Sequence, residues 1–221
     1  MIQKIQIAFI TLLTILLASC TRESSDSVDQ DKIWVKYELE YDATEDVTKA
    51  RAEFRFGGAF GTKLELSSPA TIKFNGSAVP FNSTFAFYEK EIPGLVTEGT
   101  FVYQDVDGNT FTNDTPDMRS VEFPAGEINI VGGSDYVMPF VGAAISGGDI
   151  VTLVLNDKIF ATSQSGATSI TLGGVQTAQI TNGPYIGYMH RTVSVIPAMS
   201  TSEGGLIWVT HKAANKAITV Q

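Results

Sequence analysis

Apolar and polar residues alternate in short runs from residue 32 to the end of the chain. Residues 33–41 and 50–56 show the alternation most clearly. A period of two predicts β-strands that turn one face to a core and the other to water. Similar runs, bounded by Gly, Asn, Asp, Ser or Pro, predict further strands at 64–66, 71–75, 84–92, 100–106, 110–113, 120–123, 127–131, 136–141, 150–156, 169–172, 175–180, 186–196, 206–211 and 216–220. Helical periodicity is weak throughout, so we expect an all-β fold.

The strand pattern of the first half is echoed in the second half at a nearly constant spacing of about a hundred residues. Residues 52–56 align with residues 151–155, and residues 71–76 align with residues 169–174. These alignments contain few identities, so they are also compatible with chance similarity between two strand patterns. The order of the matches favours two tandem units.

The density of strands indicates the architecture of each unit. Roughly seven short strands per hundred residues is typical of an immunoglobulin-like β-sandwich. We therefore expect two tandem immunoglobulin-like β-sandwiches, over residues 32–124 and 125–221. The hairpin connections at Asn75-Gly76 and Asp107-Gly108-Asn109 resemble those of such modules in bacterial surface proteins. A single larger sandwich over residues 32–221 is the alternative.

The N-terminus combines a positive charge at Lys4 with a mostly apolar run over residues 5–18. This run is short for a membrane span and is typical of an export signal that is removed. It ends in Leu17-Ala18-Ser19-Cys20, which resembles the signal of bacterial lipoproteins. The resemblance implies removal of a signal peptide, residues 1–19, and lipidation of Cys20 by a diacylglycerol and an acyl chain such as palmitate. A secretory signal cut elsewhere, with Cys20 as a free or buried thiol, is the alternative.

The segment that follows is polar. Residues 21–31 contain four acidic side chains and one basic side chain. With little apolar surface to bury, residues 20–31 are expected to form a short flexible tether that carries the lipid at Cys20. Thr21 stands where lipoproteins retained in an inner membrane commonly carry aspartate, so the resemblance implies an outer-membrane location. The periplasmic and cell-surface sides both stay open.

Composition excludes several classes of protein. The chain carries 15 basic and 24 acidic side chains, a formal net charge of -9. This balance excludes a broad basic surface for nucleic acid. Cys20 is the single cysteine among 221 residues, so an intramolecular disulfide and a zinc site built on thiolates are excluded as well.

Oxygen-bearing side chains at alternate positions begin a candidate calcium loop. Asp105, Asp107 and Asn109 have the spacing with which such loops start. The pattern then fails, because Thr110 stands where a sharp turn needs Gly and Pro116 stands where a bidentate Glu should follow. A hairpin turn around Asp-Gly explains the same residues, so calcium is the weaker interpretation.

Catalytic chemistry has few candidates. The two histidines, His190 and His211, both lie in predicted strands, where we expect each to be half-exposed on a polar face. The sequence contains neither the Gly-x-Ser-x-Gly nor the His-Glu-x-x-His motif. We therefore expect no catalytic residues, no metal and no cofactor.

Aromatic side chains offer a weaker functional lead. Sugars and partner proteins both dock on flat rings with polar rims. The segment 183–188 combines turn-forming residues with Tyr185 and Tyr188, which are weak candidates for ligand contacts, and Tyr185 is expected at a loop tip. Most other aromatic side chains are expected to fill the cores.

These observations favour a membrane-anchored, non-enzymatic outer-membrane lipoprotein that acts as a binding or scaffolding module in a cell-envelope or surface assembly. Its expected partners are the membrane, through the lipid on Cys20, and an envelope or surface protein. A carbohydrate-binding surface lipoprotein of a glycan uptake system is the first alternative. An envelope hydrolase on a β-sandwich is the second.

Overall fold

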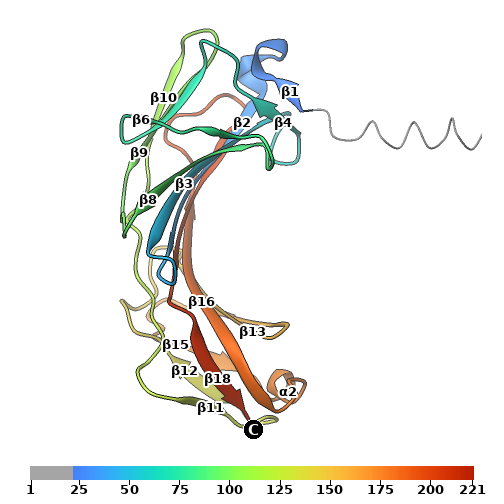
Figure 1. The fold of residues 1–221 in the computed structure, drawn as a ribbon, viewed down its shortest axis with the longest axis vertical. Coiled ribbons are helices and arrows are strands. Elements are labelled where there is room, and N and C mark those ends of the chain that lie inside the picture. Colours follow the sequence, from blue (N-terminus) through green and yellow to red (C-terminus); the bar gives the residue numbers. More distant parts are fainter. Residues whose placement is uncertain (1–21) are drawn as a thin grey trace, which may run out of the picture.

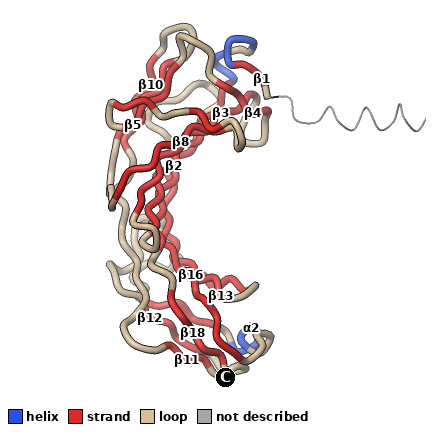
Figure 2. The backbone as a smooth tube through the Cα atoms, in the orientation of Figure 1, coloured by secondary structure: helices blue, strands red, loops and turns tan. Residues whose placement is uncertain are grey.

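The computed structural model describes residues 22–221, so Cys20 and the expected signal peptide lie outside the described residues. Figure 1 shows an elongated crescent with the first strand near one end and the C-terminus at the other. Strands run along its whole length, as Figure 2 shows, and the helical turns η1 (Ser25–Ser27), η2 (Gln30–Lys32) and α2 (Gly174–Thr177) are short. The expected all-β fold class is confirmed.

The strands divide between the two halves of the chain. Those of the first half are β1 (Glu23–Ser24), β2 (Ile33–Asp42), β3 (Val47–Phe56), β4 (Thr62–Glu65), β5 (Thr71–Phe74), β6 (Ser77–Ala78), β7 (Phe81–Asn82), β8 (Phe87–Pro93), β9 (Thr100–Gln104) and β10 (Thr110–Asp114). Those of the second half are β11 (Ile128–Ile130), β12 (Tyr136–Pro139), β13 (Ile150–Leu155), β14 (Lys158–Thr162), β15 (Ser169–Leu172), β16 (Gly183–Val195), β17 (Gly205–Lys212) and β18 (Lys216–Val220).

One twelve-stranded sheet, called the long sheet below, extends through both halves. Its central order is β1-β4-β3-β2-β17-β16-β13-β14, with β8 and β7 joined through β3, and β18 and β11 joined through β16. β17 pairs in parallel with β2, from Gly205 beside Val35 to Lys212 beside Asp42. The first and second halves of the chain therefore share backbone hydrogen bonds within one sheet.

Two hydrophobic cores lie against this sheet. Residues 33–118 supply most of the first core, and residues 121–220 supply the second. The first core also contains Ile207 and Val209 of β17. A four-stranded sheet, β10-β9-β5-β6, belongs to the first half and lies on the convex side of the crescent in Figure 1, and β12 pairs with β15 in the second half. The division into two sandwiches at residue 124 stays a prediction.

The alternation in the sequence matches the two faces of the strands. In β2 the core side is buried at Ile33, Val35, Tyr37 and Leu39, while the intervening residues are more exposed except at Glu40. The side of the long sheet opposite the two cores is called the open face below. In β2 and β3 it carries the polar members of the alternation.

Three local expectations differ from the structure. Residues 175–180, expected as a strand, form α2 and a turn, because Asp135 Oδ1 accepts the Gly174 N–H at 2.6 Å and Thr177 bonds to the backbone of Ser134. The strand expected at 84–92 begins only at Phe87, after a turn capped by Asn82. Residues 120–123 form a single bridge between Glu122 and Val141 rather than a strand.

Residues 22–31, expected as part of a flexible tether, are packed on the first half. β1 pairs in parallel with β4. Ser25 is buried, its Oγ accepts the Ser67 N–H at 2.9 Å, and its carbonyl accepts Gln30 Nε2 at 2.6 Å. These polar contacts fix a segment whose composition gives little apolar surface to bury.

Candidate binding surfaces

Around β2 and β3, the open face carries side chains of opposite charge that pair across and along neighbouring strands, called the ladder below. Arg51 bonds to Glu89 and lies 3.5 Å from Glu40, whose carboxylate is 2.8 Å from Lys212 Nζ. Lys36 Nζ lies 3.1 Å from Glu38. Because each of these charged side chains has a partner of opposite sign, their charges largely cancel on this part of the face.

Trp208 lies within this ladder and is 38% exposed. The Lys36 ammonium sits 4.7 Å from the centre of its ring, a cation–π contact. Across the sheet, Trp208 pairs with Ser194 on one side and Glu38 on the other. The lysine therefore already uses one face of the indole.

The open face becomes apolar further along the crescent. Ile159 of β14 pairs with Val154 of β13, which pairs with Tyr188 of β16, and Ile186 follows two residues before Tyr188 on the same face. These four side chains are called the apolar row below. Ile159 is 65% exposed, Tyr188 is 51% exposed and Ile186 is 47% exposed. A contiguous exposed apolar group on a sheet is a candidate interaction surface.

Tyr185 and Tyr188 do not form one platform. Tyr185 lies in β16 with Tyr188 rather than at a loop tip, and an odd separation along a strand places the two on opposite faces. Tyr185 packs against the second core and its hydroxyl donates to the Thr181 carbonyl at 2.7 Å. Only Tyr188 of this pair lies on the open face.

A pocket of about 280 Å³ adjoins Tyr188. Its lining comes from the end of β2, from β16 and from the end of β17: Asp42, Tyr188, Met189, His190, Lys212, Ala213 and Asn215. Burial, and then the charge of Lys212, lower the pKa of His190. The imidazole is therefore neutral at pH 7 and can donate and accept one hydrogen bond each.

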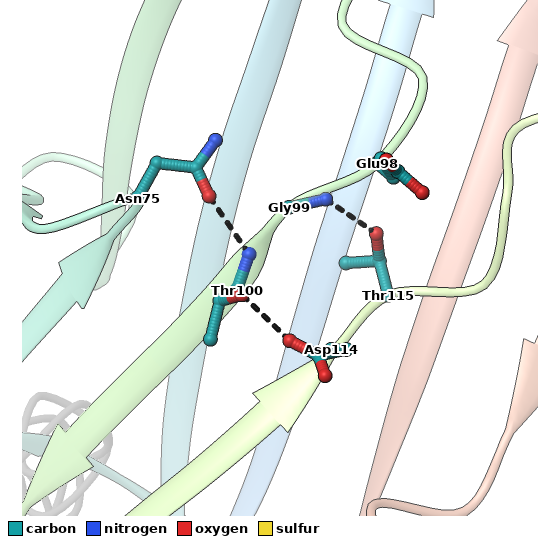
Figure 3. Close-up of a pocket in the computed structure, with 6 residues that line it drawn as sticks. All are labelled: Asn75, Glu98, Gly99, Thr100, Asp114 and Thr115. Carbon is teal, nitrogen blue, oxygen red and sulfur yellow. Dashed lines mark hydrogen bonds between the residues drawn. The ribbon is translucent and has the colours of Figure 1, made fainter.

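A second pocket, of about 500 Å³, lies at one end of the four-stranded sheet and is shown in Figure 3. Thr100 donates its N–H to Asn75 Oδ1 at 2.8 Å and its hydroxyl to Asp114 Oδ1 at 2.6 Å. The Gly99 N–H donates to Thr115 Oγ1 at 3.0 Å. These bonds hold the ends of β5, β9 and β10 together, which gives the lining a structural role.

The candidate calcium loop is a closed turn. Asp105 is buried, and its two carboxylate oxygens accept the N–H and the Nδ2 of Asn109, each at 2.8 Å. Gly108 has φ of 88°, the left-handed conformation that the turn requires. Asp107 is exposed. Within residues 22–221, no group of three or more His, Cys, Asp or Glu side chains is arranged to hold a metal ion.

His211 contradicts the expectation of a half-exposed histidine, because it is buried on the core side of β17. Its Nδ1 accepts the Val121 N–H at 3.4 Å, and its Nε2 lies 3.8 Å from Glu122 Oε1. Burial lowers the pKa of His211 and raises the pKa of Glu122. Tyr41 packs its ring 5.2 Å from the imidazole. This cluster lies where the chain passes from the first core to the second.

A buried ion pair that the sequence pattern did not indicate lies next to this cluster. Arg191, 2% exposed, bonds through Nε to Asp149 Oδ2 at 3.0 Å and through Nη1 to the Ala143 carbonyl at 2.6 Å. Arg119 Nη1 reaches the same carboxylate at 2.9 Å. Arg191 occupies a core position of the alternating strand β16. A charged residue at a core position is the feature of the sequence from which a buried ion pair could have been predicted.

Comparison with known proteins finds no matching family model and no matching curated protein. Among solved structures, the chain is similar to one from a 1.5-MDa bacterial ice-binding adhesin (14% identity, TM-score 0.28), with 80% of this chain and 75% of that chain covered. It is similar to a Ca²⁺-stabilised ice-binding adhesin of an Antarctic bacterium (14%, TM-score 0.28), with 85% of this chain and 49% of that one covered. It is also similar to fibronectin(III)-like modules of Clostridium thermocellum CbhA (10%, TM-score 0.23), with 82% and 95% covered.

The helices of the described part of the chain are short. Over residues 22–221, none is long and apolar enough to cross a bilayer.

Proposed function

We propose that the protein is a non-enzymatic outer-membrane lipoprotein, anchored through a lipid on Cys20, that binds a protein partner in a cell-envelope or surface assembly. The observation that carries the binding role is the apolar row, which lies exposed on the open face. Aromatic and aliphatic side chains at the centre of a polar surface are typical of protein interfaces.

The surroundings of the apolar row support this role. The ladder of paired charges on the open face would leave few uncompensated charges to desolvate next to a partner. Tyr188 is suited to an interface because a tyrosine buries a large apolar ring and keeps a hydroxyl for hydrogen bonding. β14 is the terminal strand of the sheet order on this side, and an edge strand can pair with another chain.

Crosslinking in intact cells tests the binding role. A photoreactive phenylalanine analogue at Tyr188 is expected to give a covalent adduct with one envelope protein, and the same analogue at Val137 is the matched control. Val137 is 59% exposed but lies on β12, outside the apolar row. Co-purification of that protein should fall in Tyr188→Ser with Ile159→Ser and persist in Val137→Ser. Equal yields from the three proteins would contradict the proposal.

The lipid anchor has its own test. Radiolabelled palmitate is expected to enter the protein and to be absent from Cys20→Ala, which should also leave the membrane fraction. Retention of the variant in membranes at the parental level would contradict the anchor. Accessibility of intact cells to an added protease reports the side of the membrane on which the protein lies.

A carbohydrate ligand is the second candidate function, because the pocket beside Tyr188 joins one aromatic ring to polar side chains. Asp42, His190, Lys212 and Asn215 supply donors and acceptors within this pocket of about 280 Å³. Binding on a glycan array that is lost in Tyr188→Ala and kept in Tyr185→Phe would favour this function. Turnover of any glycan or peptide, abolished by His190→Ala, would contradict both binding roles.

A further inference from the structure

We propose that the end of the molecule that carries Phe60 and Phe85 lies directly against the bilayer surface, with both rings in the headgroup region. The proposal rests on the lipid anchor at Cys20 proposed above. It is carried by the short connection to Cys20, by the direction in which the chain meets the folded body, and by two exposed rings at that place.

The connection between the proposed lipid and the folded body is very short. Only Thr21 separates Cys20 from Arg22, where the described chain begins. Arg22 is held by the body, because its Nη1 donates to the Ser83 carbonyl at 3.2 Å and its Nε lies 3.3 Å from Glu65 Oε2. Two residues span at most about 7 Å. A lipid on Cys20 would therefore keep this end of the molecule next to the headgroups.

The direction of β1 shows which loop lies next to the point where the chain enters the folded body. β1 runs parallel to β4, with Glu23 beside Leu64 and Ser24 beside Glu65. The chain therefore enters β1 from the Thr62 end of β4, where the loop 57–61 connects β3 to β4. Figure 1 shows β1 and β4 together near one end of the crescent, away from the C-terminus.

The loop 57–61 holds Phe60 outward. The Gly57 N–H donates to the Lys32 carbonyl at 2.9 Å, and the Gly61 N–H donates to the Gly58 carbonyl at 2.9 Å. A Cβ on Gly61 would lie 1.8 Å from the Phe56 carbonyl oxygen, so only glycine permits this tight turn. Phe60 itself is 100% exposed. A phenylalanine ring held entirely in solvent by a hydrogen-bonded turn is free to enter an apolar or interfacial environment, where burial of its surface is favourable.

Phe85 lies in the turn between β7 and β8. It is 60% exposed and stacks in parallel on Phe87, with ring centres 5.7 Å apart. Lys63 of β4 donates Nζ to the Phe85 carbonyl at 2.9 Å, which ties this turn to the strand that β1 joins. The two exposed rings therefore project from the turns beside the point where the chain enters the body.

The charged side chains at this end of the molecule do not favour anionic lipid over neutral lipid. The basic side chains here have acidic partners, in the pairs Arg22 with Glu65, Lys63 with Glu53, and Lys32 with Glu203. The segment after Arg22 adds acidic side chains. Phenylalanine, by contrast, enters the boundary between headgroups and acyl chains by burying apolar area, a contribution separate from electrostatic attraction to anionic lipid. The occupant of this surface is therefore the bilayer interface itself, recognised through phenylalanine.

The test uses the mature lipidated protein in vesicles of phosphatidylethanolamine and phosphatidylglycerol. Lipidation consumes the only thiol of the chain, so a cysteine introduced by Ala59→Cys can carry a polarity-sensitive fluorophore. Gln176→Cys on α2, at the far end of the crescent in Figure 1, is the matched control. The label at position 59 is expected to shift to shorter wavelength and to be quenched by nitroxide-labelled lipid, whereas the label at position 176 is not.

Variants then separate the two rings from the anchor. Phe60→Ser and Phe85→Ser are each expected to reduce the ratio of inserted to solvent-exposed label about tenfold. Val175→Ser, an exposed apolar residue on α2, should leave the ratio unchanged. Vesicles of phosphatidylcholine alone should give the same result.

The outcomes distinguish the two proposals. A label at position 59 that stays in water in the acylated protein overturns the inference and leaves the anchor intact. Absence of palmitate from Cys20 overturns the anchor and the inference together. Insertion only with anionic lipid overturns recognition through phenylalanine.

Discussion

Removal of the Asp149 carboxylate is expected to destabilise the second half of the molecule strongly. The Arg191 guanidinium beside it is 2% exposed and keeps only the carbonyls of Ala143 and Ala144 once Asp149→Ala is made. Removing one partner of a buried ion pair costs about 3–5 kcal/mol, because the remaining charge stays in a medium of low polarity. The two carbonyl contacts favour the lower value, about 3 kcal/mol.

Urea unfolding followed by circular dichroism measures this loss. With a slope of about 2 kcal/mol per molar urea, the midpoint should fall by about 1.5 M. Arg119→Ala is the control, because that side chain is 39% exposed, and it should cost less than about 1 kcal/mol. Replacing both buried partners, with Asp149→Leu and Arg191→Met, should recover most of the loss. Equal midpoints for Asp149→Ala and Arg119→Ala would refute the role assigned to the buried pair.

Three further predictions concern other parts of the fold. Burial lowers the pKa of His211 in the folded protein. The contribution of the neutral imidazole to the stability of the fold is therefore fully present above the unfolded pKa of about 6.5, and it is lost as the pH falls through the lowered pKa. Between pH 7 and pH 5 the melting temperature should fall less in His211→Gln than in the parent. Gly99→Ala should cost about 1–3 kcal/mol in urea unfolding, because a Cβ would lie 2.2 Å from the Phe74 ring; a loss below 0.5 kcal/mol, roughly, would contradict this. Ser25→Ala leaves the part-buried Ser67 N–H without its acceptor, so limited proteolysis should cut residues 22–31 faster than in the parent, and an unchanged rate would count against the packing described.

The sequence predicted the faces of the strands well, because a period of two is a local property. The alternation in residues 33–41 and 50–56 marks the buried positions of β2 and β3 correctly. The same rule also shows, without a structure, that Tyr185 and Tyr188 point to opposite sides of one strand. The assignment of Tyr185 to a loop tip was wrong because Gly183 and Pro184 begin β16 rather than forming a turn.

Other features depend on contacts between distant segments and leave no local signal. The parallel pairing of β2 with β17 joins residues more than 150 positions apart in the chain. Residues 175–180 have a strand-like pattern, yet Asp135, some forty residues earlier, caps a helical turn there. The polar segment 22–31 is ordered by backbone pairing with β4 and by the Ser67 N–H, in the turn after β4, which donates to Ser25 Oγ. Composition alone gives no indication of such partners.

The pairing of β2 with β17 bears directly on the proposed roles. Eight residue pairs, from Gly205 beside Val35 to Lys212 beside Asp42, connect the two halves through one sheet, and Ile207 enters the core of the first half. Figure 1 shows β1 near one end of the crescent, whereas β13, which supplies part of the apolar row, lies in the half that ends at the C-terminus. If lipid holds the first end, the sheet carries the apolar row away from the bilayer by its own length. The distance between the bilayer and a bound partner would then be set by the length of the long sheet, because residues 22–31 are bound to the body and add little extension.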